Sequence, residues 1–149
     1  MNRAAAAAVA MGVAMATAVG GYALDAGMAR ADRPAPAPGT VTVDLDIHHS
    51  RFSPERIRVA PGTLVRFVVH NRDPINHELI VGDDDVHARH TRGTEAVHPP
   101  VPGELSVGPG ETGVTALRFA EPGRVLFACH LPGHFEYGMK GEVVVTGPA

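Results

Sequence analysis

The chain of 149 residues contains a single cysteine, Cys129, and this scarcity excludes any disulfide within the chain. An exposed free thiol is prone to oxidation in an oxidising compartment. Three states therefore remain open for Cys129: buried and inert, paired with another chain, or held by a soft metal ion. The sequence also lacks the paired CxxC spacing that is typical of structural zinc sites.

Excess positive charge is missing as well. The chain has 13 Lys and Arg residues against 16 Asp and Glu residues, which gives a formal net charge of −3. A nucleic-acid-binding protein usually carries a basic patch or stripe. Here the two signs of charge are interspersed without a long basic run, so we expect no nucleic-acid partner.

Charge is absent from residues 4 to 24, a run of 21 residues that follows the basic start Met1-Asn2-Arg3. The small-x-small sequence Ala29-Arg30-Ala31 then precedes Asp32, as in a secretory signal peptide. The apolar run is also long enough to span a bilayer. We therefore predict that residues 1–31 are a signal peptide or an N-terminal membrane anchor. Either form exports the protein, which would be periplasmic, cell-surface or secreted, with or without a membrane tether.

Residues 32–40 are rich in Pro and Ala and are expected to form an extended linker. Residues 41–149 then form one domain, in which helical periodicity is missing. Short segments instead alternate apolar and polar residues, or are apolar throughout, and turn signals such as Pro61-Gly62 and Pro109-Gly110 separate them. The predicted fold class is all-β, a Greek-key sandwich or barrel of about eight strands. The clearest expected strands are 41–47, 57–59, 64–69, 77–81, 124–129 and 141–145.

One segment, residues 82–103, breaks this pattern because it has no strand character. Asp83 to Asp85 favour the first turn of a short helix, in which His87 and His90 would share a face. Together with His98 these histidines would form a secondary metal site. A solvated loop is the alternative, and both interpretations remain open.

The stretch CHLPGHFEYGMKGE, which begins at Cys129, holds the main candidate site. Side chains alternate along a strand, so Cys129 shares the face of Phe127 and points into the core. Pro and Gly residues let the following loop fold back, which can aim His134 and Met139 at the sulfur. A thiolate, a thioether and an imidazole together select copper, and a blue-copper site needs one further histidine. His77, at the start of the segment 77–81, is the best candidate, and His70 is its nearest rival.

The segments NHELIV at residues 76–81 and CHLPGHFEYGMKGEVVV from Cys129 resemble the cupredoxins, the small blue (type 1) copper proteins that include plastocyanin and azurin. The resemblance covers residues 41–147 and implies an eight-stranded Greek-key sandwich with one copper at its loop-bearing end. It implies copper ligation by His77, Cys129 and His134, with Met139 as the axial ligand. In the spacing Cys-x4-His-x4-Met, the interval between Cys and His is longer than in plastocyanin, and the interval between His and Met is longer than in azurin. The loop looks more like that of sulfocyanin-type bacterial cupredoxins.

The resemblance also implies details around the copper. Azurin's extra carbonyl ligand comes from a Gly immediately before the first histidine, and Asn76 stands there in this chain, so we expect four ligands. Asn76 is expected to brace the loop that follows Cys129. The electron would leave through the ring edge of His134, and redox partners would dock on an apolar patch formed by Leu131, Pro132, Phe135 and Tyr137 around it.

The sequence thus predicts an exported, monomeric electron-transfer protein with one copper ion and no enzymatic activity. Two alternatives remain. One is a copper carrier or copper-resistance protein without electron transfer. The other is an electron-donating subunit of a multicopper enzyme such as nitrite reductase, in which a histidine next to the cysteine, here His130, would bind a second copper. The absence of a second domain and of any His-x-His pair argues against the enzyme, and His130 is expected to be exposed.

Overall fold

A computed structural model describes residues 39–93 and 99–147. The predicted signal peptide or anchor at 1–31, most of the predicted linker and His98 lie outside these described residues. Across the two described ranges, no helix is both long and apolar enough to cross a membrane.

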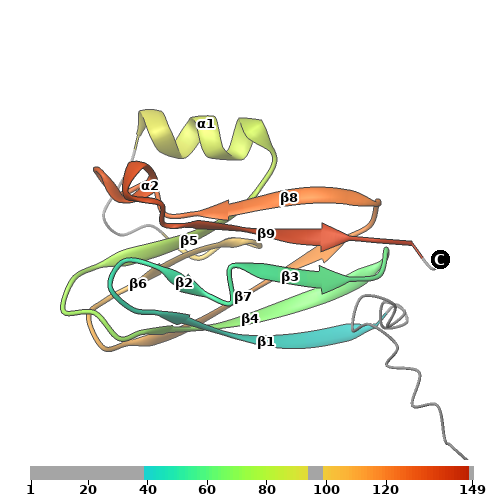
Figure 1. The fold of residues 1–149 in the computed structure, drawn as a ribbon, viewed down its shortest axis with the longest axis horizontal. Coiled ribbons are helices and arrows are strands. Elements are labelled where there is room, and N and C mark those ends of the chain that lie inside the picture. The colour runs from blue at the N-terminus through green and yellow to red at the C-terminus, as the bar shows by residue number, and fades with distance from the viewer. Residues whose placement is uncertain (1–38, 94–98, 148–149) are drawn as a thin grey trace, which may run out of the picture. The chain divides into compact units, whose positions relative to one another are not determined.

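Within the described ranges the chain forms nine strands in two sheets, which confirms the predicted all-β sandwich (Figure 1). The four-stranded sheet has the order β2-β1-β4-β7, and the five-stranded sheet has the order β3-β9-β8-β5-β6. The strands are β1 (Thr40–Ile47), β2 (Phe52–Ser53), β3 (Arg56–Val59), β4 (Thr63–Asn71), β5 (His77–Gly82), β6 (Glu104–Val107), β7 (Thr112–Phe119), β8 (Gly123–Ala128) and β9 (Lys140–Val145).

Alternating burial along the strands builds the core between the two sheets. In β4, Val65, Phe67 and Val69 are fully buried while Arg66 is exposed. Phe127 of β8 meets this layer from the opposite sheet, and its ring packs edge-on against Phe52. The alternation of apolar and polar residues that predicted these strands therefore also places the apolar side chains in the core.

Two parallel pairings connect distant parts of the chain. Strand β1 runs parallel to β4, and β3 runs parallel to the last strand, β9. At Gly141 in β9 the backbone passes so close to the Phe127 ring and the Glu55 carbonyl that a Cβ atom there would overlap both. Glycine is thus required at this position by close packing.

The segment 82–103 contains the helix α1 (Asp84–Arg92), which confirms the predicted short helix. The Asp83 side chain caps its N-terminus by accepting a hydrogen bond of 3.0 Å from the backbone N–H of Val86. Acidic residues in the first turn and Arg92 in the last complement the helix dipole. Figure 1 shows α1 outside the five-stranded sheet, alongside β8.

The loop between β8 and β9 contains a single helical turn, α2 (His134–Tyr137). Gly133 and Gly138 flank it with positive φ angles of 82° and 101°, which other residues rarely adopt. Figure 1 shows α2 at the end of the sandwich opposite the C-terminal end of β9. This turn reverses the direction of the chain, which then continues into β9.

Candidate metal centre

Three predicted ligands come together at the end of the sandwich that carries α2. The ligand atoms of His77, Cys129 and His134 all lie within 4.8 Å of one another. The Cys129 Sγ atom is 3.2 Å from His134 Nδ1, and the two imidazole rings are 4.9 Å apart between centroids. His77 begins β5, Cys129 directly follows β8, and His134 begins α2, so the fold itself assembles the set.

The nitrogen atoms of His77 show that its ring is arranged for a metal. Its Nε2 atom is 2.9 Å from Asp73 Oδ2, and because a carboxylate can only accept, Nε2 carries the proton. The buried Nδ1 atom has no hydrogen-bond partner among the described residues. A buried lone pair without a partner is costly in a merely structural histidine, and it is the atom that a metal requires.

Met139, the fourth predicted ligand, is held to the other loop ligands through its backbone. Its side chain is fully buried, and its carbonyl accepts a hydrogen bond of 3.1 Å from the N–H of Cys129. The Met139 N–H in turn donates to the His134 carbonyl at 2.9 Å. The three loop ligands are therefore tied to one another through the backbone.

The charge state of the site suits copper uptake with the loss of one proton. Burial raises the pKa of the Cys129 thiol to about 12, so without a metal the thiol is protonated. Burial lowers the pKa of His77 and of His134, which keeps both rings neutral near pH 7. Metal binding needs a thiolate and neutral imidazoles, so only the thiol proton must leave.

A family model described as "Copper binding proteins, plastocyanin/azurin family" matches residues 39–146. The protein is a cupredoxin of the plastocyanin/azurin family. Copper is the metal of this site, held by His77, Cys129, His134 and Met139.

Named relatives of this cupredoxin include copper-resistance proteins and auracyanins. The copper-resistant cuproprotein CopI of Rubrivivax gelatinosus is 40% identical over 98 residues, which are 64% of this chain and 59% of CopI. Auracyanin-B of Chloroflexus aurantiacus is 33% identical over 110 residues, 64% of this chain and 47% of that protein. The chain thus spans less than two thirds of either relative.

A solved structure shows the same fold. Auracyanin A, a blue copper protein from Chloroflexus aurantiacus, superposes with a TM-score of 0.60 at 22% identity, covering 72% of this chain and 100% of that one. None of these three relatives is a sulfocyanin, and the likeness of the copper loop to that group stays a prediction.

An aspartate fixes the first histidine ligand of the cupredoxin. Besides binding His77, Asp73 accepts backbone N–H bonds of 2.7 Å from His49 and 2.8 Å from Ser50. Burial alone would raise the pKa of Asp73, but these hydrogen bonds lower it on balance, so the carboxylate is ionised. Asn71 supports the same loop by donating to three backbone carbonyls and accepting the Asp73 N–H.

The brace of the loop after Cys129 is Glu78, and the prediction of Asn76 for this role is wrong. The His130 N–H donates to Glu78 Oε1 at 2.7 Å, whereas Asn76 is exposed. Glu78 is buried because β5 is covered on its outer face by α1, so even its outward residue lies inside the protein. The sequence signal was the run HELIV, whose lack of alternation is typical of a strand buried on both faces.

The remaining histidines of the described residues fall into two groups. His70, the rival ligand, bonds instead to Thr112 and Asp44 at the four-stranded sheet, and His48 and His49 stack together at the surface. The second group lies under α1. His87 and His90 are buried on one face of the helix, as predicted, and His130 contacts His87 and stacks on Phe135.

His130 is half-buried, which corrects the expectation that it is exposed. Its Nε2 atom lies 2.8 Å from Nδ1 of His87, and its ring centroid lies 5.1 Å from that of His87. Burial and the neighbouring His87 and His90 lower the pKa of His130 to about 4, so its ring is neutral at pH 7.

The predicted docking residues differ in their exposure to solvent. Leu131 is buried in the core and offers no surface, whereas Pro132 and Tyr137 are exposed and His134 and Phe135 are partly so. Two cations border this area, with the Arg51 guanidinium 5.0 Å from the Tyr137 ring centroid and Lys140 Nζ 4.4 Å from that of Phe135.

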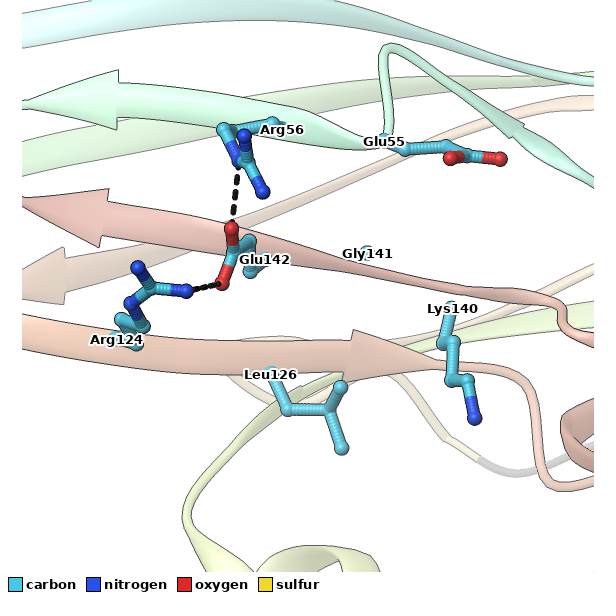
Figure 2. A pocket seen from close by; sticks show the side chains of 7 residues that line it. All are labelled: Glu55, Arg56, Arg124, Leu126, Lys140, Gly141 and Glu142. Atoms are coloured by element: carbon cyan, nitrogen blue, oxygen red, sulfur yellow. Dashed lines mark hydrogen bonds and ion pairs between the residues drawn. The ribbon is translucent and has the colours of Figure 1, made fainter.

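A separate charged pocket of about 490 Å³ lies on the outer face of β3, β9 and β8. Figure 2 shows Glu142 between Arg56 and Arg124, bonded to them at 2.6 Å and 3.1 Å. These arginines, Arg56 first, lower the pKa of Glu142. None of the four copper ligands lines this pocket, and its charges are largely paired with one another.

Proposed function

We propose that this cupredoxin transfers single electrons between redox proteins through one type 1 copper. The observation that supports this most directly is the preassembled ligand set, in which three buried or half-buried donors lie within 4.8 Å of one another. When bound, the copper supplies a one-electron redox couple whose potential depends on the axial ligand and on the surroundings of the sulfur.

The residues around the copper ligands hold them in place, which favours fast electron transfer. Asp73 fixes the ring of His77, and Glu78 fixes the backbone immediately after Cys129. The backbone bonds between Cys129, His134 and Met139 close the loop upon itself. Ligands that are held before the metal arrives change little when an electron enters or leaves, which keeps the barrier to transfer low.

The proposed exit for the electron is His134, whose ring is half-buried and lies beside exposed apolar side chains. Pro132, Phe135 and Tyr137 would form the docking patch around it, without Leu131, for a redox protein as donor or acceptor. We further infer that the protein acts as a monomer, without catalysis of its own. Export to the periplasm, the cell surface or the medium remains the proposal for its location.

The test is spectroscopic and electrochemical. Protein loaded with one equivalent of copper(II) should show an intense visible thiolate-to-copper band and a small copper hyperfine splitting. It should cycle reversibly in voltammetry. Cys129→Ser should lose the band. A pale spectrum with ordinary, large hyperfine splitting would end the electron-transfer proposal.

A second candidate function is copper resistance without electron transfer, because CopI is named as copper-resistant and is 40% identical over 98 residues. This function requires copper to be taken up or released readily. Copper exchange with a chelator measures it directly: loss of copper within seconds at neutral pH would favour a carrier, and retention for hours together with reversible cycling would favour electron transfer.

A further inference from the structure

Two histidines outside the type 1 ligand set face each other beside it. His87 lies on the buried face of α1, and His130 follows Cys129 directly in sequence. Their facing atoms, His87 Nδ1 and His130 Nε2, are 2.8 Å apart. The hydrogen bonds at the other nitrogen of each ring determine whether this contact joins a donor to an acceptor or two acceptors.

The ring of His87 presents a lone pair to His130. Its Nε2 atom lies 3.2 Å from the carbonyl oxygen of Leu126. A carbonyl can only accept, so Nε2 carries the proton. In a neutral imidazole the other nitrogen then has none, and Nδ1 of His87 is an acceptor.

The ring of His130 is arranged in the same sense. Its Nδ1 atom lies 3.3 Å from the hydroxyl oxygen of Thr91. That hydroxyl donates its proton to the His87 carbonyl at 2.9 Å, so its oxygen is left to accept from His130 Nδ1. With its proton on Nδ1, His130 directs the Nε2 lone pair toward His87 Nδ1, and this is the tautomer that a metal ion between the two rings requires. Outward N–H groups bonded to a carbonyl and a hydroxyl are how proteins orient metal-ligating histidines.

The space at this pair suits a metal ion. Two metal–nitrogen bonds of about 2.0 Å span about 2.8 Å when they meet at a right angle and about 3.3 Å at the tetrahedral angle. The observed separation of 2.8 Å therefore needs little or no movement. Both rings line a pocket of about 590 Å³ that Asp84 and Glu136 also line, which offers water and carboxylate oxygens for the remaining positions.

We propose that His87 Nδ1 and His130 Nε2 bind a second copper ion, which exchanges with the solvent through this pocket. Imidazole suits copper, and nitrogen sites bind Cu²⁺ more tightly than the other divalent first-row metals. Among the described residues, the ion has two nitrogen ligands against the four ligands of the type 1 copper, so we expect it to be released more readily. This site does not depend on the electron-transfer function proposed above.

The second copper lies next to the first along the chain, because one peptide unit joins its ligand His130 to Cys129. A metal that shifts the His130 ring also pulls on the backbone N–H that binds Glu78. Filling the second site should therefore change the position or intensity of the type 1 visible band without abolishing it.

The test uses the full chain already loaded with one equivalent of copper, titrated with a second equivalent of copper(II) against a weak chelator. We expect a second paramagnetic signal with ordinary, large hyperfine splitting beside the type 1 signal. In His87→Ala the second copper should bind at least about tenfold more weakly, while the type 1 band remains and shows that the fold is intact. The matched control is His48→Ala, which removes an exposed histidine elsewhere.

Equal second-site affinity in wild type and His87→Ala would overturn the proposal, because the ion would then sit elsewhere in the chain. A second measurement avoids dependence on the variant. In protein whose type 1 site holds copper(I), a further equivalent of copper(I) should shift the ¹⁵N resonances of His87 Nδ1 and His130 Nε2. Unmoved resonances at these atoms would overturn the proposal, because the pair would then bind no metal.

Discussion

The Nε2 atom of His77 lies 2.9 Å from Oδ2 of Asp73, four residues earlier in the chain. This carboxylate is held in turn by the backbone N–H groups of His49 and Ser50. The orientation of a copper ligand on β5 is thus set by the turn that follows β1. Ligand geometry in this protein depends on residues that never touch the metal.

Asp73→Asn should weaken copper binding by about 10- to 100-fold, since loss of a partner behind a metal-ligating histidine typically has this effect. The amide cannot accept from all three donors that the carboxylate serves. Chelator competition measures the change. Asp46→Asn is the matched control, because the one side-chain partner of Asp46 among the described residues is the exposed Arg72, which follows β4. Equal affinities in the two variants would contradict this role.

Glu78→Gln should raise the reduction potential of the copper. The buried carboxylate lies next to His77 and binds the loop after Cys129, and its negative charge favours Cu(II) over Cu(I). A neutral amide of the same shape removes this preference, by on the order of 60 mV if the equilibrium shifts tenfold. Voltammetry measures the potential, with the exposed Glu121→Gln as control. A potential that falls or stays the same would show that the Glu78 charge does not act on the copper.

Copper(II) affinity should rise with pH by about tenfold per unit between pH 7 and 9. Burial raises the pKa of the Cys129 thiol to about 12, so copper must displace one proton throughout this range. His77 and His134 add nothing, because burial lowers the pKa of each and both are already neutral. Competition titrations at three pH values provide the slope. A flat dependence would mean that the thiol is already ionised without copper.

Gly141→Ala should lower the free energy of unfolding by about 1–3 kcal/mol, the usual cost of overpacking. The added methyl group would overlap the Phe127 ring and the Glu55 carbonyl, and neither can move without disturbing the core or the backbone. Urea denaturation of the copper-free protein measures the loss. Gly147→Ala, where the new Cβ meets no atom within 4 Å, should be nearly neutral.

The strands were predictable because each sheet has a buried face and the sequence repeats with that period. Val41–Ile47 was expected and Thr40–Ile47 is observed, and 64–69 was expected where Thr63–Asn71 is observed. The two-residue strand β2 (Phe52–Ser53) was missed because two residues carry no periodicity. Nothing in the sequence marks β1 as parallel to β4, since that pairing follows from the fold as a whole.

The copper ligands were predictable from residue type and spacing, but their supporting residues were not. Asn76 was expected as the brace because it precedes His77, and the structure gives the role to Glu78. Glutamate is rarely buried, and its burial here depends on the position of α1 over β5. His130 was expected to be exposed for the same reason: the helix that covers it comes from a segment without strand character.

The parallel pairing of β3 with β9 places Arg56 beside Glu142, 86 residues later. A growing chain therefore cannot complete the five-stranded sheet until its last strand has been made. Cys129, His134 and Met139 also lie near the C-terminal end, and His77 alone precedes them. A truncated product that stops before Cys129 would contain every strand of the four-stranded sheet yet would lack three of the four copper ligands. Acquisition of this metal thus marks a chain that has been synthesised at least as far as Met139.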